Sequence, residues 1–143
     1  MNEEEIRQKL AVLETYNQQI QKLQEELVNI GLMKNEINKA IETLEGIKEN
    51  DEVLFPIGAG AFVKAKVLEK DKVIVGIGAN IFVDKNIDEV IKEFKKSVED
   101  IEKAEAKGKE QIENTIKVAR KIQKELEKEL ARIQKEQQEQ QQK

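Results

Sequence analysis

The side chains that could do chemistry in this chain are carboxylates, amines and amides, because two common catalytic residue types are missing. The sequence has 29 Asp and Glu and 25 Lys and Arg, but no His and no Cys. Imidazole catalysis, thiolate nucleophiles and zinc sites built from Cys or His are therefore excluded. A catalytic carboxylate needs a pocket that shifts its pKa, and a pair of long heptad helices offers none. We predict no enzymatic activity, no cofactor and no metal site.

One glycine-rich run invites comparison with a phosphate-binding loop. Gly58-Ala59-Gly60-Ala61 lacks the third glycine of the dinucleotide fingerprint and the Gly-Lys-Ser/Thr of a P-loop. It also leads into a predicted strand, so no helix N-terminus would face a bound anion. We therefore interpret this run as a turn.

Composition narrows the class of partner. The net charge is −4 and aromatic residues make up 3% of the chain, which argues against a nucleic-acid site. The acidic excess lies within residues 1–50, which carry 6 basic and 10 acidic residues. No apolar run reaches the ~20 residues of a membrane span, and the acidic start is unlike a signal peptide. We expect a cytoplasmic protein with no nucleic-acid or membrane partner, and the richness in Glu, Lys and Ile favours a thermophile.

Two long segments carry apolar residues at heptad spacing, which predicts a left-handed coiled coil. In the first segment the two heptad series are Ile6, Leu13, Ile20, Leu27, Lys34, Ile41 and Lys9, Tyr16, Leu23, Ile30, Ile37, Leu44. In the second they are Ile87, Phe94, Ile101, Gly108, Thr115, Ile122, Glu129 and Ile91, Val98, Glu105, Ile112, Ala119, Leu126, Ile133. Each apolar seam must be buried against a partner helix.

The insert between the two segments is long enough to reverse the chain, so each helix is expected to pair with the other, antiparallel. The predicted helices span about residues 3–49 and from about residue 88 to 134 or beyond, with Asn2 and Asn86 as N-caps. The polar, Gln-rich tail of residues 134–143 has no seam residue and is expected to fray or be disordered.

A register that pairs Leu44 with Ile91 brings Ile6 close to Glu129, so that both termini lie at the far tip. Near the middle of the coil, the seam is interrupted at similar height by Lys34, Glu105 and Gly108. We therefore expect a weak point there.

The insert reads as four short strands in two hairpins. Apolar runs at residues 53–57, 62–68, 73–77 and 81–83 are separated by turns of Gly, Ala, Asp and Asn. Pro56 has no N–H to donate, so the first strand lies at an edge or leaves the ladder there. Two hairpins this small cannot bury both faces within one chain, so we expect other subunits to cover them.

The chain therefore divides into three parts. Residues 1–50 form an N-terminal coiled-coil helix, residues 51–86 form two β-hairpins that act as an oligomerisation platform, and residues 87–143 form a C-terminal coiled-coil helix with a polar tail. The predicted fold class is mostly α with a small β part. It is a long antiparallel two-helix coiled coil joined by two β-hairpins.

Apolar residues at the predicted tip have two interpretations. The first is that they finish the seam. The second starts from Leu10 and Leu130, which fall outside the strict heptad positions and should be partly exposed near the helix ends. Exposed apolar groups on a mobile tip can bind the apolar surface of another chain without sequence preference.

The insert resembles that of a known family, the prefoldins. The run Phe-Pro-Ile-Gly-Ala-Gly-Ala-Phe at residues 55–62 and the run Gly-Ile-Gly-Ala-Asn-Ile-Phe-Val-Asp-Lys at residues 76–85 are similar to the prefoldin α class. The order long helix, two hairpins, long helix is similar too, over essentially the whole chain. The β class has one hairpin, so two hairpins favour α. One departure is Asn80, which stands where the family often has a second Gly before two aromatic residues.

The resemblance implies a hexamer of two α-type and four β-type prefoldin subunits. Their hairpins would form a β-barrel platform, and their coiled coils would hold unfolded client proteins at the tips without ATP and deliver them to a group II chaperonin. The implied platform residues are Phe55, Ile57, Phe62, Val63, Val67, Val73, Val75, Ile77, Ile81 and Val83. The implied client-binding residues are Ile6, Leu10, Leu13, Leu126, Leu130 and Ile133.

Two other interpretations stay open. An archaeal γ-type prefoldin, or another structural coiled-coil assembly protein, would build filaments or homo-oligomers through the same hairpins. A spacer or tether would use the coiled coil without binding clients.

Overall fold

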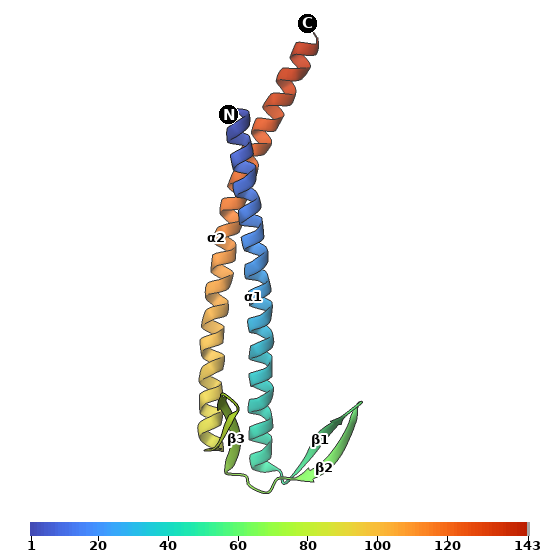
Figure 1. Ribbon diagram of the computed structural model, residues 1–143, viewed down its shortest axis with the longest axis vertical. Coiled ribbons are helices and arrows are strands. Elements are labelled where there is room, and N and C mark those ends of the chain that lie inside the picture. Colours follow the sequence, from blue (N-terminus) through green and yellow to red (C-terminus); the bar gives the residue numbers. More distant parts are fainter. Residues whose placement is uncertain (143) are drawn as a thin grey trace. The chain divides into compact units, whose positions relative to one another are not determined.

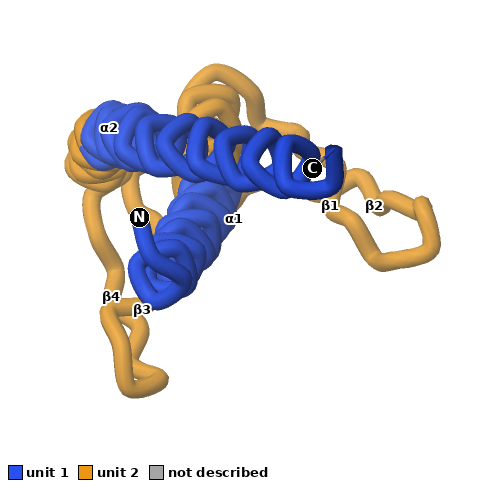
Figure 2. The backbone as a smooth tube through the Cα atoms, turned by 90° about the horizontal axis from the view of Figure 1, so that it is seen from above, with its two compact units in different colours: residues 1–29, 104–143 blue, residues 30–103 orange. Residues whose placement is uncertain are grey.

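The structure is a computed structural model in which residues 1–142 are described. It has the two long helices and two antiparallel hairpins that the sequence predicted (Figure 1). In chain order the elements are α1 (Glu3–Glu49), β1 (Glu52–Gly58), β2 (Ala61–Lys66), β3 (Lys72–Gly78), β4 (Ile81–Asn86) and α2 (Ile87–Gln141). They fall into two compact units. Unit 1 joins residues 1–29 to 104–143, and unit 2 holds residues 30–103 (Figure 2).

Both helices begin at an asparagine cap. The backbone N–H of Glu5 donates to Asn2 Oδ1 at 2.8 Å. Asn86 Oδ1 accepts from the N–H groups of Asp88 (2.9 Å) and Glu89 (3.4 Å). These bonds satisfy N–H groups that have no partner within the first turn of a helix. Both predicted N-caps are therefore confirmed.

The second helix continues beyond Gln134, which the prediction left open, and it includes most of the polar tail. α2 continues to Gln141, so the prediction of a frayed or disordered tail is wrong up to that residue. Gln, Glu and Lys are good helix formers, and the Arg132–Glu136 pair at 2.7 Å supports the turn before the tail. The last residue of the predicted tail lies outside the described residues.

The predicted heptad seam is the covered side of both helices. Every residue of the four series is buried or half-buried, whereas most positions between them are exposed. In unit 1 the most enclosed seam residues are Ile112, Ala119 and Leu126. Lys9 Nζ lies 2.6 Å from Glu125 Oε2 in the same unit, which agrees with the predicted antiparallel register.

Unit 2 holds the main apolar core, at the ends of the two helices nearest the hairpins. Ile41, Ile87 and Ile91 are buried there, and Leu44 and Phe94 pack against them. Each such side chain contributes about 1.5–3 kcal/mol through its burial. The cluster contains the predicted Leu44–Ile91 layer and therefore supports that register. It also joins α1 to α2 at their hairpin ends.

The two hairpins repeat one backbone design at an interval of twenty residues. In β1–β2, Pro56 pairs with Phe62 and Gly58 with Ala61, so that Ile57 is left over in a bulge. In β3–β4 the same shift occurs between Gly76 and Gly78. β2 stops before the predicted end, and β4 runs on until α2 begins.

The turns repeat as well. Ala59 and Gly60 both have positive φ (51° and 76°), and so do Ala79 and Asn80 (50° and 59°). Two consecutive residues in this region make a type I′ turn, whose twist matches that of the strands. Asn80 thus fills the place of a second glycine because Asn tolerates the left-handed region.

None of the helices within residues 1–142 is long and apolar enough to cross a membrane. The same residues contain no group of three or more acidic side chains placed to hold a metal ion.

Candidate functional site

The first hairpin leaves several large apolar side chains exposed. Phe55, Ile57 and Phe62 are 61%, 62% and 59% exposed, and Val63 is exposed as well. Phe55 and Val63 are cross-strand partners, so these two side chains share one face of the hairpin. Large apolar side chains clustered in this way mark an interaction surface.

The second hairpin is covered on one face by its own chain. A cleft of about 370 Å³ is lined by β3 residues Val73 and Val75 and by helix residues that include Leu44, Val90 and Phe94. Val73 packs against the core cluster, and Lys85 Nζ lies 3.3 Å from Glu93 Oε2 of α2. Only this one face is covered, in agreement with the expectation that so small a hairpin cannot bury both of its faces within one chain.

The opposite face of the second hairpin stays open. Ile74 and Phe82 are 73% and 66% exposed, and the Phe82 ring lies so close to Gly76 that an added Cβ would come within 3.2 Å of it. Ile77 and Ile81 near the turn are also more than half exposed. Sequence reasoning assigned Ile77 and Ile81 to the platform but missed Leu54, Ile74 and Phe82. For Leu54 and Ile74 the available signal was a position opposite a charged residue, Lys64 or Asp84, whereas Phe82 stands opposite Gly76.

Of the ten predicted platform residues, six are exposed in the single chain and four are half-buried. The exposed ones are Phe55, Ile57, Phe62, Val63, Ile77 and Ile81, and the half-buried ones are Val67, Val73, Val75 and Val83. Four of the exposed residues lie on the first hairpin and two on the second.

The predicted tip residues lie in unit 1 and differ in exposure. Leu10 and Leu130 are 50% and 49% exposed, in agreement with their positions outside the seam. Leu126 is only 3% exposed and belongs to the interior of the helix pair. The remaining predicted tip residues, Ile6, Leu13 and Ile133, are half-buried. Among the six predicted tip residues, the two leucines are therefore the ones that leave apolar surface open.

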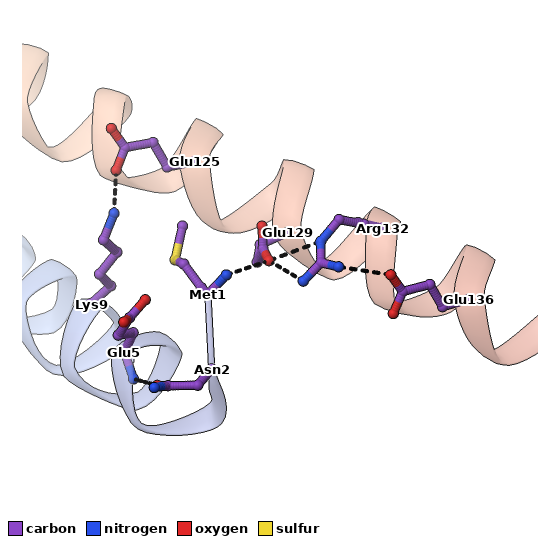
Figure 3. A network of polar contacts seen from close by, with 8 residues as sticks. All are labelled: Met1, Asn2, Glu5, Lys9, Glu125, Glu129, Arg132 and Glu136. Carbon is purple, nitrogen blue, oxygen red and sulfur yellow. Dashed lines mark hydrogen bonds and ion pairs between the residues drawn. The ribbon is translucent and has the colours of Figure 1, made fainter.

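Ion pairs join the N-terminal end of the chain to α2 in the same unit (Figure 3). Glu129 accepts hydrogen bonds from Arg132 Nε (3.0 Å) and Nη2 (2.5 Å) and from the amino group of Met1 (3.0 Å). These bonds lower the pKa of the Glu129 carboxyl, with Arg132 the larger cause. On the neighbouring turn, the hydrogen bond and charge of Lys9 lower the pKa of Glu125. The tip thus carries both ion pairs to α2 and exposed leucines.

The glycine in the middle of the seam makes room for a leucine. A Cβ added at Gly108 would lie 2.8 Å from Leu27 Cδ2 and 3.4 Å from Leu27 Cγ. Leu27 therefore packs against the bare backbone of α2, as a knob in a shallow hole. The sequence analysis counted Gly108 as an interruption because glycine has no apolar side chain of its own. It did not consider that Leu27 of the other helix could fill the space.

Comparison with known proteins agrees with this architecture. The family model for the prefoldin subunit matches residues 16–136. The chain is 47% identical over 116 residues to prefoldin subunit alpha of Methanococcus aeolicus, covering 81% of each chain. It is 45% identical over 114 residues to prefoldin subunit alpha 1 of Methanocaldococcus jannaschii, covering 80% of each.

A solved structure shares the fold. The filamentous PFD from Methanocaldococcus jannaschii, determined by cryo-EM, matches with a TM-score of 0.66 at 23% identity. The match covers 78% of this chain and 95% of that one. Sequence and fold comparisons agree, and this chain belongs to the prefoldin family.

Proposed function

We propose that this chain is a subunit of an ATP-independent chaperone that holds unfolded proteins at the tip of its helix pair and delivers them to a group II chaperonin. The observation that carries the proposal is the exposure of Leu10 and Leu130, at about half of each side chain, beside an ion-paired helix end. Unfolded chains expose apolar side chains without a fixed order. Two separate leucines on a helical tip can contact them without demanding a sequence.

The hairpins supply the second part of the proposal. Their exposed apolar surfaces would be covered by other prefoldin subunits, in an assembly of two chains of this kind with four β-type subunits. Several tips on one platform would then bind one client together, so weak single contacts add up to a useful and reversible affinity. Release would come from competition with the chaperonin, because no nucleotide-binding motif is present in the sequence.

The tip assignment can be tested by removing the two leucines. In Leu10→Ser/Leu130→Ser we expect the assembly to form normally but suppression of client aggregation to fall severalfold. The matched control is Val28→Ser, which removes a side chain of α1 that is 63% exposed but lies away from the tip. Equal suppression by the leucine variant and the wild type would contradict the proposal and favour a spacer role.

A filament-forming role is the second candidate. It is favoured by the likeness in fold to a prefoldin described as filamentous and by the free strand edges of both hairpins. A filament would need no β-type partner, because the two hairpins of one chain could each join a different neighbour. Long homo-oligomers formed by this chain alone would support this candidate.

A further inference from the structure

The second half of α2 carries more positive than negative charge. Residues 114–135 contain seven basic and three acidic residues, whereas residues 88–110 of the same helix contain six basic and eight acidic residues. The surplus is centred on four lysines spaced four, three and four residues apart, so that they share one face of the helix over about 17 Å. We call these four residues the lysine stripe: Lys117, Lys121, Lys124 and Lys128.

The lysine stripe lies on the side of α2 opposite the seam. Its members stand at the heptad positions farthest from the partner helix, and all four side chains are exposed. The seam residues on the same turns, Ala119 and Leu126, are buried. The stripe therefore stays open when the two helices are paired. It belongs to the same compact unit as the exposed leucines, Leu10 and Leu130.

The chain's own carboxylates do not neutralise the lysine stripe. None of its four lysines makes an ion pair of 4.0 Å or less with any of residues 1–142. Two of the three acidic residues on these turns are already bound. Glu125 is paired with Lys9 of α1. Glu129 is paired with Arg132 and with the amino group of Met1 (Figure 3). The positive charge of the stripe is therefore left for a ligand.

Charges of one sign at this spacing oppose helix formation. Like charges four residues apart on a helix repel each other, whereas Glu and Lys at the same spacing attract each other. The stripe contains two such like-charged pairs, in residues 117–121 and 124–128. In the half of α2 nearest the hairpins, carboxylates alternate with lysines at this spacing, as in Glu99 and Lys103. A surface that only had to be solvated would gain stability from that alternation, and an anionic ligand would relieve the repulsion within the stripe.

The composition of this region favours a polypeptide over a nucleic acid as the anion. Residues 104–143 contain no aromatic side chain on which a base could stack, and the net charge of the chain is −4. The stripe is also made of lysine and not of arginine, whose planar group binds phosphate at two fixed points. A lysine ammonium is a compact charge on a flexible stem, so it can follow the carboxylates of a chain without fixed structure.

We propose that the lysine stripe binds acidic segments of unfolded client chains, so that this chain favours clients rich in Asp and Glu. The inference rests on the proposed function, in which the tip holds unfolded proteins, and it adds a contact for carboxylates to the apolar contact of the leucines. About five residues of an extended acidic segment span the stripe. The attraction acts at a distance and requires no particular sequence, and salt weakens it.

The test measures the binding of two labelled peptides to the full-length chain by fluorescence anisotropy at low salt. One peptide alternates Glu with Gly, and the other alternates Gln with Gly. The wild type should bind the Glu peptide at least tenfold more tightly than the Gln peptide. Replacing all four lysines of the stripe by Gln should weaken binding of the Glu peptide about tenfold, because several exposed ion pairs are lost together. Gln is as good a helix former as Lys, so α2 should stay helical.

Two further variants serve as controls. Replacing the four lysines of the stripe by Arg keeps the charge, and it should keep the affinity for the Glu peptide. The matched control makes the same change from Lys to Gln at four exposed lysines in the other half of α2, and it should bind as the wild type does. These four lysines are Lys92, Lys96, Lys103 and Lys107.

Two results would overturn the proposal. One is an equal loss of affinity in the stripe variant and the matched control, which would make net charge and not the stripe the cause. The other is tighter binding of single-stranded oligothymidylate than of the Glu peptide at the same salt concentration, which would assign the stripe to nucleic acid.

An aggregation assay separates this inference from the proposed function. The stripe variant keeps both exposed leucines, so it should still suppress the aggregation of a client with few acidic residues and lose suppression of an acidic one. If Leu10→Ser/Leu130→Ser holds clients as well as the wild type does, the proposed function fails, although the stripe still binds the Glu peptide. If the stripe variant binds the Glu peptide normally, this inference fails and the role of the leucines is untouched.

Discussion

At the scale of single residues, the glycine at position 108 shows how one missing side chain shapes a coiled coil. In Gly108→Ala the helix propensity of α2 improves by about 1 kcal/mol, but the new Cβ crowds Leu27, and overpacking costs about 1–3 kcal/mol. We expect a net loss of roughly 1 kcal/mol in the free energy of unfolding, measured by denaturant titration.

A second glycine provides the comparison. Gly31 lies inside α1, and a Cβ added there meets nothing within 4 Å. Gly31→Ala should therefore stabilise the protein by about 1 kcal/mol, with no opposing steric cost. If both alanine variants gained stability equally, the contact between Leu27 and Gly108 would not restrict the seam.

At the scale of secondary-structure elements, the ends of α1 and α2 should respond to acid. Lys9 lowers the pKa of Glu125 below its ordinary value of 4.5. A carboxyl with a lowered pKa in the folded state stabilises the fold above about pH 4.5 and loses that contribution as the pH falls.

The test compares the wild type with Glu125→Gln by thermal unfolding between neutral pH and pH 3. The wild type should be slightly more stable at neutral pH, and the difference should shrink toward zero in acid, because the pair is exposed and its contribution small. High salt should reduce the difference as well. A difference that did not change with pH would contradict the assigned role of the pair.

The middle of the two long helices carries one more prediction. The predicted weak point at the interrupted seam remains a prediction, and hydrogen exchange of mid-helix amides measures it directly. Amides there as protected as those of neighbouring turns would contradict it. The close approach of Gly108 to Leu27 already removes one of the three reasons for expecting it.

At the scale of the whole molecule, assembly should depend on β-type prefoldin subunits. A large part of the hairpin surface is apolar and exposed in the single chain, including Phe55, Ile74 and Phe82. Mixing this chain with a β-type subunit should give a defined hexamer in native mass spectrometry, because burial of that surface drives association. A ladder of large homo-oligomers that the β-type subunit does not change would favour the filament.

Much of this architecture follows from sequence alone because its signals are local and periodic. A heptad repeat specifies the covered side of a helix wherever the helix lies, so all predicted seam residues, from Ile6 to Ile133, are buried or half-buried. Asn2 and Asn86 mark helix starts through bonds to neighbours within three residues. Glycine and asparagine likewise marked the hairpin turns through their tolerance of positive φ.

Other features depend on which residues meet across the chain, and only the tertiary structure decided them. Val73 and Val75 are covered because β3 lies against the helix ends. Phe55, which corresponds to Val75 in the first hairpin, is exposed. Gly108 leaves room for the Leu27 side chain and does not interrupt the packing of the seam there. Sequence periodicity records the local backbone, but packing between distant segments is set by their shapes and contacts in three dimensions.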